Sequence, residues 1–153
     1  MRGFEVVKDE KRKHWGADIQ LPTLGTEHSA AYDLYAPDNF YIPPFTGKAS
    51  DVCKIWTDVK AYMQEDEVLE INVRSSMGGK LMLANTQAWI DADFYENESN
   101  DGNIGLFLIN LSDEPIVINR GDRIAQGMFL KTLRADNIES TNKRIGGFGS
   151  TNN

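Results

Sequence analysis

The chain has 153 residues, 41% hydrophobic and 25% charged, which is typical of one globular domain with a substantial core. Its formal net charge of −7 argues against non-specific nucleic-acid binding, and no apolar run approaches the length of a membrane span. The single cysteine, Cys53, excludes an internal disulfide, and His14 and His28 lack zinc-ligand spacing. The first residues lack the basic-then-apolar order of a secretion signal, so we expect a cytoplasmic protein that binds neither membrane nor nucleic acid.

The first half of the chain has the pattern of short strands separated by turns. Residues 8–13 are charged and predict a solvated loop, and Pro22 and Gly25 interrupt any regular element before residue 30. Polar and apolar residues alternate over 51–63, which predicts one half-buried strand. We expect strands at residues 3–7, 30–36, 40–42, 51–63 and 67–73.

The second half continues the pattern. A strand from residue 81, a turn near Gln87 and a return strand ending at 91–94 predict a hairpin, and the polar, acidic residues 96–103 predict an exposed loop. Three more strands are expected at 105–111, 115–118 and 124–131, with a turn at 119–122. No sustained helical period is visible, so the sequence predicts an all-β, jelly-roll-like barrel (a β-clip) of short strands over residues 1–142. Residues 143–153 are rich in glycine and predict a mobile C-terminal arm.

Two carboxylates, Asp91 and Asp93, end the apolar run of the predicted return strand. Because side chains alternate along a strand, both acids point to one side, where they can face a ligand. Taken alone, this spacing is more often a solvated strand end.

Polar groups also gather in the segment 74–80. Arg74, Ser75 and Ser76 offer a guanidinium, two hydroxyls and turn N–H groups ahead of two glycines, which are the donors that an anion needs. A solvated turn with an N-cap serine is the alternative.

Three further segments carry polar residues that a structural strand does not need. Gln126 lies inside an apolar strand and needs hydrogen-bond partners unless it is at an edge. Asp33 interrupts an aromatic strand, as part of an Asx-type turn or facing a metal-bound water. The tail brings Lys143 and Arg144 close to the ring of Phe148, although a disordered terminus has the same composition.

In order, these segments resemble the five conserved motifs of the trimeric dUTP diphosphatase (dUTPase) family, at residues 30–36, 74–80, 85–94, 121–126 and 143–151. The resemblance implies a homotrimer of jelly-roll-like all-β subunits with three active sites at subunit interfaces, each closed by the C-terminal arm of another subunit. It also implies hydrolysis of dUTP to dUMP and pyrophosphate with Mg²⁺, which keeps uracil out of DNA and supplies dUMP for dTMP synthesis.

The resemblance assigns roles around the phosphates. Asp91 matches the carboxylate that contacts the sugar 3′-hydroxyl and orients or deprotonates the water that attacks the α-phosphorus. Arg74, Ser75 and Gln126 match phosphate contacts, with Ser75 near the oxygen bridging the α and β phosphates. Asp33 would hold waters of the Mg²⁺ shell.

It also assigns roles around the nucleoside. The Asn85 amide and the backbone from Ala88 to Ile90 would pair with the uracil edge. Phe94 replaces the usual tyrosine beneath the deoxyribose, where its bulk would reject a 2′-hydroxyl, and Phe148 would stack over the uracil. The implied catalytic residues are Asp91, Ser75 and Gln126; the implied substrate-binding residues are Arg74, Ser76, Asn85, Ala88, Trp89, Ile90, Phe94, Lys143, Arg144, Phe148, Gly149, Ser150 and Thr151; and the implied metal residue, acting through water, is Asp33.

Some positions depart from the family pattern. Ser76 and Ala88 replace glycines. Lys143 has the usual spacing from Gly146, whereas Arg144 has the usual chemistry, so either can be the residue that reaches the γ-phosphate. Arg123 is expected to be structural, pairing with an acid beneath the site.

Two alternatives remain. The chain also resembles dCTP deaminases in the segments 74–76 and 90–94, but these enzymes need a Glu where this chain has Phe107. A non-catalytic nucleotide-binding module is the other alternative, with the loop at 96–101 as its candidate partner surface.

Overall fold

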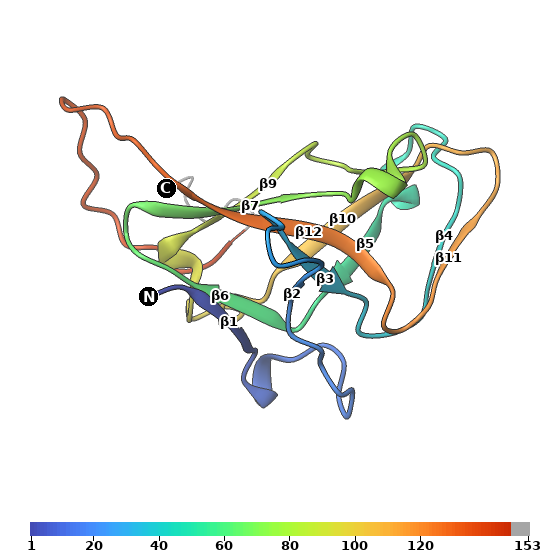
Figure 1. Ribbon diagram of the computed structural model, residues 1–153, viewed down its shortest axis with the longest axis horizontal. Helices are drawn as coiled ribbons and strands as arrows, with labels where there is room; N and C mark the ends of the chain where they lie inside the picture. The colour runs from blue at the N-terminus through green and yellow to red at the C-terminus, as the bar shows by residue number, and fades with distance from the viewer. Residues whose placement is uncertain (148–153) are drawn as a thin grey trace.

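In the computed structural model, residues 1–147 are described, and they form an all-β subunit of short strands (Figure 1). The predicted class is confirmed, and most predicted strands are present within one or two residues. The strands are β1 Gly3–Val6, β2 Thr23–Leu24, β3 Tyr32–Tyr35, β4 Phe40–Ile42, β5 Cys53–Trp56, β6 Val59–Tyr62, β7 Glu67–Asn72, β8 Leu81–Leu83, β9 Ala88–Asp91, β10 Gly105–Asn110, β11 Ile116–Ile118 and β12 Arg123–Lys131. Four 3-10 turns accompany them: η1 Asp9–Lys11, η2 Ala49–Asp51, η3 Ser75–Met77 and η4 Ala92–Phe94. None of the described elements is a helix long and apolar enough to cross a membrane.

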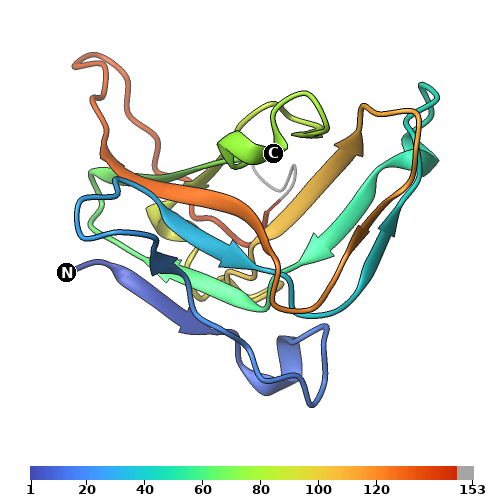
Figure 2. The same cartoon turned by 45° about the vertical axis from the view of Figure 1, so that its right-hand side comes forward.

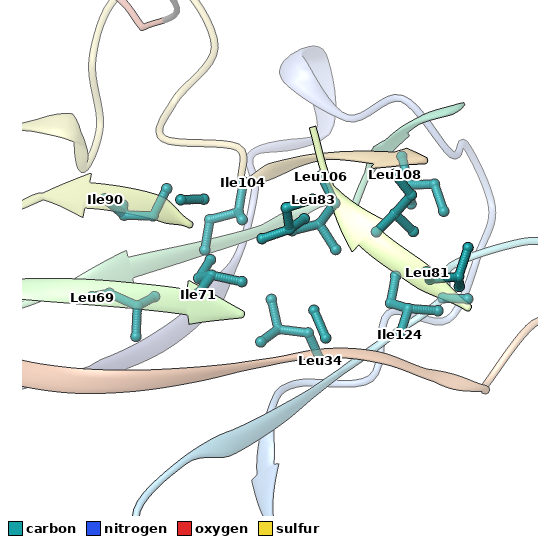
Figure 3. Packing of buried hydrophobic residues seen from close by; sticks show 14 of the residues in the cluster. Leu34, Leu69, Ile71, Leu81, Leu83, Ile90, Ile104, Leu106, Leu108 and Ile124 are labelled. Carbon is teal, nitrogen blue, oxygen red and sulfur yellow. The ribbon is translucent and has the colours of Figure 1, made fainter. Parts of the chain in front are cut away.

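The strands form four sheets whose ladders are all antiparallel among the described residues. The largest has the order β2-β3-β12-β7-β9, and a second has the order β5-β10-β8. Figure 2 shows these two sheets leaning apart from a shared base, with the β4–β11 pair extending beyond β5. Their facing side chains make one apolar core, in which residues such as Leu34, Leu69, Ile71, Leu106 and Leu108 are at most 1% exposed (Figure 3).

The prediction of a single strand over 51–63 is wrong, because Thr57 and Asp58 form a turn that separates β5 from β6. Asp58 has φ of +56°, a left-handed conformation that no strand continues through. Its buried carboxylate accepts hydrogen bonds from the backbone N–H groups of Lys13 and His14 and from the Asn103 amide, which stabilise the turn. As a result, β5 joins β10 while β6 joins β1.

The expected hairpin over 81–94 is also wrong in its pairing. The turn is present, with the Thr86 N–H donating to the Leu83 carbonyl and Thr86 at φ of +62°. However, β8 pairs with β10 and β9 pairs with β7, so the two strands belong to different sheets. The turn therefore bridges the two layers of the core.

Two loops were also misjudged. Residues 21–26, expected to be irregular, contain β2, which pairs with β3. The loop at 96–103, expected to be exposed, is exposed only in part: Asn97, Asp101 and Asn103 are 7%, 3% and 0% exposed, whereas Glu96, Glu98 and Ser99 are exposed.

The N-terminus is fixed to the start of β7 by a charged contact. The Arg2 Nε donates to both carboxylate oxygens of Glu67, at 3.0 and 3.1 Å, and the Gln64 backbone N–H donates to the same carboxylate at 3.0 Å. These donors lower the pKa of Glu67 to about 2, with the Arg2 hydrogen bond as the largest cause.

This lowered pKa predicts a pH-dependent contribution to stability. Because Glu67 is ionised more readily in the folded chain, its contribution is complete above the unfolded pKa of about 4.3 and is lost as pH falls toward about 2. The difference in urea unfolding free energy between the wild type and Glu67→Gln should therefore be constant from pH 7 to 5 and shrink below pH 4. A difference that does not change over this range would contradict the assignment.

Candidate active site

A pocket of about 150 Å³ lies where β9 and η4 meet the start of β10 and the C-terminal segment. In Figure 1 this segment leaves β12, makes a wide loop and returns to the middle of the molecule. The pocket is lined by Asn85, Ala88, Trp89, Ile90, Asp91, Phe94, Gly105, Arg144 and Gly147. Seven of these nine are residues that the sequence assigned to a site.

Strand β9 gives the pocket its wall because it is the edge of the five-stranded sheet. Alternation along the strand buries Ala88 and Ile90, each 7% exposed, and turns Trp89 and Asp91 outward. Since β7 occupies one edge of β9 and no described strand pairs with the other, backbone donors and acceptors face the pocket side.

Asp91 and Asp93 both bind Arg144. The Arg144 Nε donates to Asp93 at 2.6 Å, and its Nη2 forms a close ion pair with Asp91. The sequence suggested that strand alternation would place both acids on one side. Instead, both acids contact one guanidinium because the chain enters the 3-10 turn η4 directly after Asp91. The Arg144 side chain is only 14% exposed, whereas Lys143 is exposed.

Phe94 closes the base of the pocket and is 5% exposed. The Arg144 guanidinium carbon lies 6.0 Å from the centre of its ring. Gly147 lies so close that a Cβ atom there would be 2.4 Å from a ring carbon. A glycine is thus required for the C-terminal segment to reach the ring.

A second cluster, which we call the Asp33 cluster, consists of Asp33, Arg74, Arg123 and Gln126. Asp33 is 7% exposed and accepts from the Arg74 Nε at 2.8 Å and from the Arg123 Nη1 at 3.4 Å. Gln126 lies directly across the β3–β12 ladder from Asp33. The expectation that Arg123 pairs with an acid is confirmed, and Arg74, expected on a phosphate, is also paired with this acid.

The pocket and the Asp33 cluster are not brought together within one chain. Gln126 is opposite Asn72 at one end of β7, and Asp91 is opposite Val68, four residues away, which corresponds to about 13 Å along a strand. Ser75 is exposed in η3, and Ser76 accepts a 3.4 Å hydrogen bond from Arg74. Phe148, Gly149, Ser150 and Thr151 lie outside the described residues.

Two residues that contact this site were not in the predicted set. Asp93 was noted only for its spacing from Asp91, and its ion pair with Arg144 gives that spacing a role. Asn97 was placed in a solvated loop, but its amide donates to the Phe94 carbonyl at 2.8 Å. No sequence pattern marks this contact of Asn97, because the acceptor on Phe94 is a backbone atom.

The chain is similar to known dUTPases over most of its length. The dUTPase family model matches residues 17–152. A deoxyuridine 5'-triphosphate nucleotidohydrolase from Lactococcus lactis is 42% identical over 99% of this chain and 97% of its own length, and one from Rickettsia bellii is 35% identical over 86% and 87%. The crystal structure of dUTPase from Streptococcus mutans superposes with a TM-score of 0.75 at 34% identity, covering 88% of this chain and 98% of that one.

A dUTPase from phage phi11 of Staphylococcus aureus is 18% identical with a TM-score of 0.65 and supports the fold alone. With a family model and relatives that cover nearly its whole length, and with residues of two of the five motif segments lining one pocket, this chain belongs to the dUTPase family.

Proposed function

We propose that the protein hydrolyses dUTP to dUMP and pyrophosphate, with Asp91 as the general base. The observation that supports this most is the position of Asp91 at the mouth of the pocket, at the end of an edge strand and beside Phe94. A carboxylate there accepts a proton from a water that attacks the α-phosphorus, while the bond to the bridging oxygen breaks and pyrophosphate leaves.

The nucleoside would occupy the pocket. The edge of β9 with which no described strand pairs would supply backbone donors and acceptors for the uracil edge, with the exposed Asn85 amide beside them. The Phe94 ring would lie beneath the deoxyribose, where a 2′-hydroxyl has no room. Phe148 would stack above the base from the arm, residues 143–153.

The phosphates would bind the Asp33 cluster of a second subunit. Because Asp91 and Gln126 lie at opposite ends of β7, one chain does not assemble the whole constellation. A homotrimer with sites at subunit interfaces brings Arg74, Ser75 and Gln126 of one chain to the pocket of another. Arg74 supplies positive charge that a triphosphate needs on a protein of net charge −7, while Arg123 pairs with Asp33.

Mg²⁺ fits this arrangement as an ion held mainly by phosphates and water. Asp33 is one carboxylate already paired with two arginines, and no group of three or more His, Cys, Asp or Glu side chains gathers in the described part of the chain. This donor set suits a hydrated ion whose water ligands would donate hydrogen bonds to the Asp33 carboxylate. The ion would neutralise part of the phosphate charge. The dUTPase of phage phi11 coordinates a structural Mg(II) ion.

The deaminase alternative is weakened by Phe107. It lies on β10 with the Lys54 ammonium 5.5 Å from the centre of its ring, and it is not among the described residues that line the pocket. The purified protein, incubated separately with dUTP and dCTP and Mg²⁺, should release pyrophosphate and dUMP from dUTP alone. Conversion of dCTP would favour deamination. No reaction of either nucleotide would favour a non-catalytic nucleotide-binding module.

Asp91→Asn tests the general base at constant side-chain volume. We expect turnover of dUTP to fall by about 10²–10⁴-fold, because the amide does not accept the water's proton. The matched control is Asp93→Asn, which removes a neighbouring carboxylate that also contacts Arg144, and its loss of turnover should be at least tenfold smaller. Equal losses would remove Asp91 from this role.

Arg144 and Lys143 form a second matched pair. Because Arg144 is packed against Asp91 and Asp93 while Lys143 is exposed, we propose that Arg144 is the arm residue that reaches the phosphates. Arg144→Ala should lower kcat/KM for dUTP by about 10–100-fold through loss of a charge-assisted contact, and Lys143→Ala by less than about threefold. The reverse order would assign the phosphate contact to Lys143.

A further inference from the structure

The loop that follows Phe94 is folded back onto that residue. The Asn97 Nδ2 donates to the Phe94 carbonyl at 2.8 Å, and the Asn97 backbone N–H donates to the same oxygen at 3.4 Å. Gly102, at φ of +85°, packs so close that a Cβ atom would lie 3.0 Å from this oxygen. The backbone of Phe94 is therefore held from its carbonyl side by two donors and by close packing.

Asn97 is itself held in one orientation. Its Oδ1 accepts from the backbone N–H groups of Ser99 and Asn100, both at 3.1 Å, and its amide also donates to the Asn100 Oδ1 at 2.7 Å. Because Asn97 is only 7% exposed, hydrogen bonds to water would not fully replace these hydrogen bonds if they were lost. Its side chain can fix the Phe94 carbonyl because every polar atom of the amide has a partner.

A buried lysine fastens this loop to the core. The Lys60 side chain is 3% exposed, and its ammonium donates to Asp101 at 3.0 Å and to Glu96 at 3.3 Å. It also lies 4.9 Å from the centre of the Tyr95 ring. Burial lowers the pKa of Lys60, but the hydrogen bonds to Asp101 and Glu96 and the charges of these two acids together outweigh burial and raise the pKa above its ordinary value.

The N-terminal segment adds two more contacts to the loop. The Lys8 backbone N–H donates to Asp101 at 2.9 Å, and the Lys11 ammonium donates to the Ser99 carbonyl at 3.2 Å. Strand β6, the N-terminal segment and the loop thus form one charged unit behind Phe94.

We propose that Asn97 is a positioning residue for sugar selectivity, holding Phe94 rigidly so that its ring excludes a 2′-hydroxyl from the pocket. This inference rests on the proposed function, in which Phe94 lies beneath the deoxyribose. A side chain that excludes a hydroxyl by bulk does so only if moving it away is costly. The hydrogen bonds from Asn97 to the Phe94 carbonyl raise this cost through the backbone.

The test compares kcat/KM for dUTP and for UTP in the wild type, Asn97→Ala, Asn97→Asp and the control Glu98→Ala. Glu98 lies in the same loop and is exposed. Asn97→Asp keeps the acceptor for Ser99 and Asn100 and removes the donor to Phe94. We expect the dUTP-to-UTP preference to fall about tenfold in both Asn97 variants, as expected for a lost buried hydrogen bond of about 1.4 kcal/mol, and to be unchanged in Glu98→Ala.

Hydrogen exchange of the amides in residues 92–95 supplies a readout that needs no turnover, and it should be faster in both Asn97 variants. Faster exchange with an unchanged dUTP-to-UTP preference would overturn the inference and leave a purely structural loop. Unchanged exchange would also overturn it. A wild type that hydrolyses neither nucleotide would instead refute the proposed function, and the exchange result would still decide whether Asn97 holds Phe94.

Discussion

The geometry of the site depends on the ladders on either side of β7. On one side β7 pairs with β12 over six residue pairs, and on the other with β9 over four. Leu69 and Ile71 point from its inner face into the core and are fully buried, and each such side chain contributes about 1.5–3 kcal/mol. With β7 fixed in this way, Asp91 and Gln126 are held near its two ends, and the proposed chemistry would use a second subunit to bring these groups together.

Strand positions could be predicted from sequence because they depend on local patterning, but strand partners could not. The alternation over 51–63 continues through Asp58, and only the positive φ and the hydrogen bonds from Lys13, His14 and Asn103 show that the strand ends there. The same limit applies to β8 and β9: the turn between them was foreseen, whereas their assignment to different sheets follows from long-range pairing with β10 and β7.

Most of the pocket's lining residues could be marked from sequence because they lie within one short segment, 85–94. Asn85, Ala88, Trp89, Ile90, Asp91, Phe94 and Arg144 line one pocket as a family pattern in the sequence suggested. The choice between Lys143 and Arg144 was open in sequence, because spacing favoured one and chemistry the other. The burial of Arg144 against Asp91 and Asp93 supports Arg144 as the residue that contacts the phosphates. The loop at 96–103 was misjudged for a related reason: its acidic residues look solvated until their buried partner, Lys60, is placed beside them.

The edge position of β9 has a further consequence for solubility. A strand with one unpaired side is a template on which another chain can add a strand, and Trp89 on its outer face is 59% exposed. Recognition of a base through backbone atoms needs that edge to stay open, so it cannot be covered by a permanent neighbour. β9 is only four residues long and ends at Asp91, with Asp93 following in η4, and short length and charge both discourage strand addition. Asp91, the carboxylate of the proposed chemistry, thus also helps to protect the open edge from self-association.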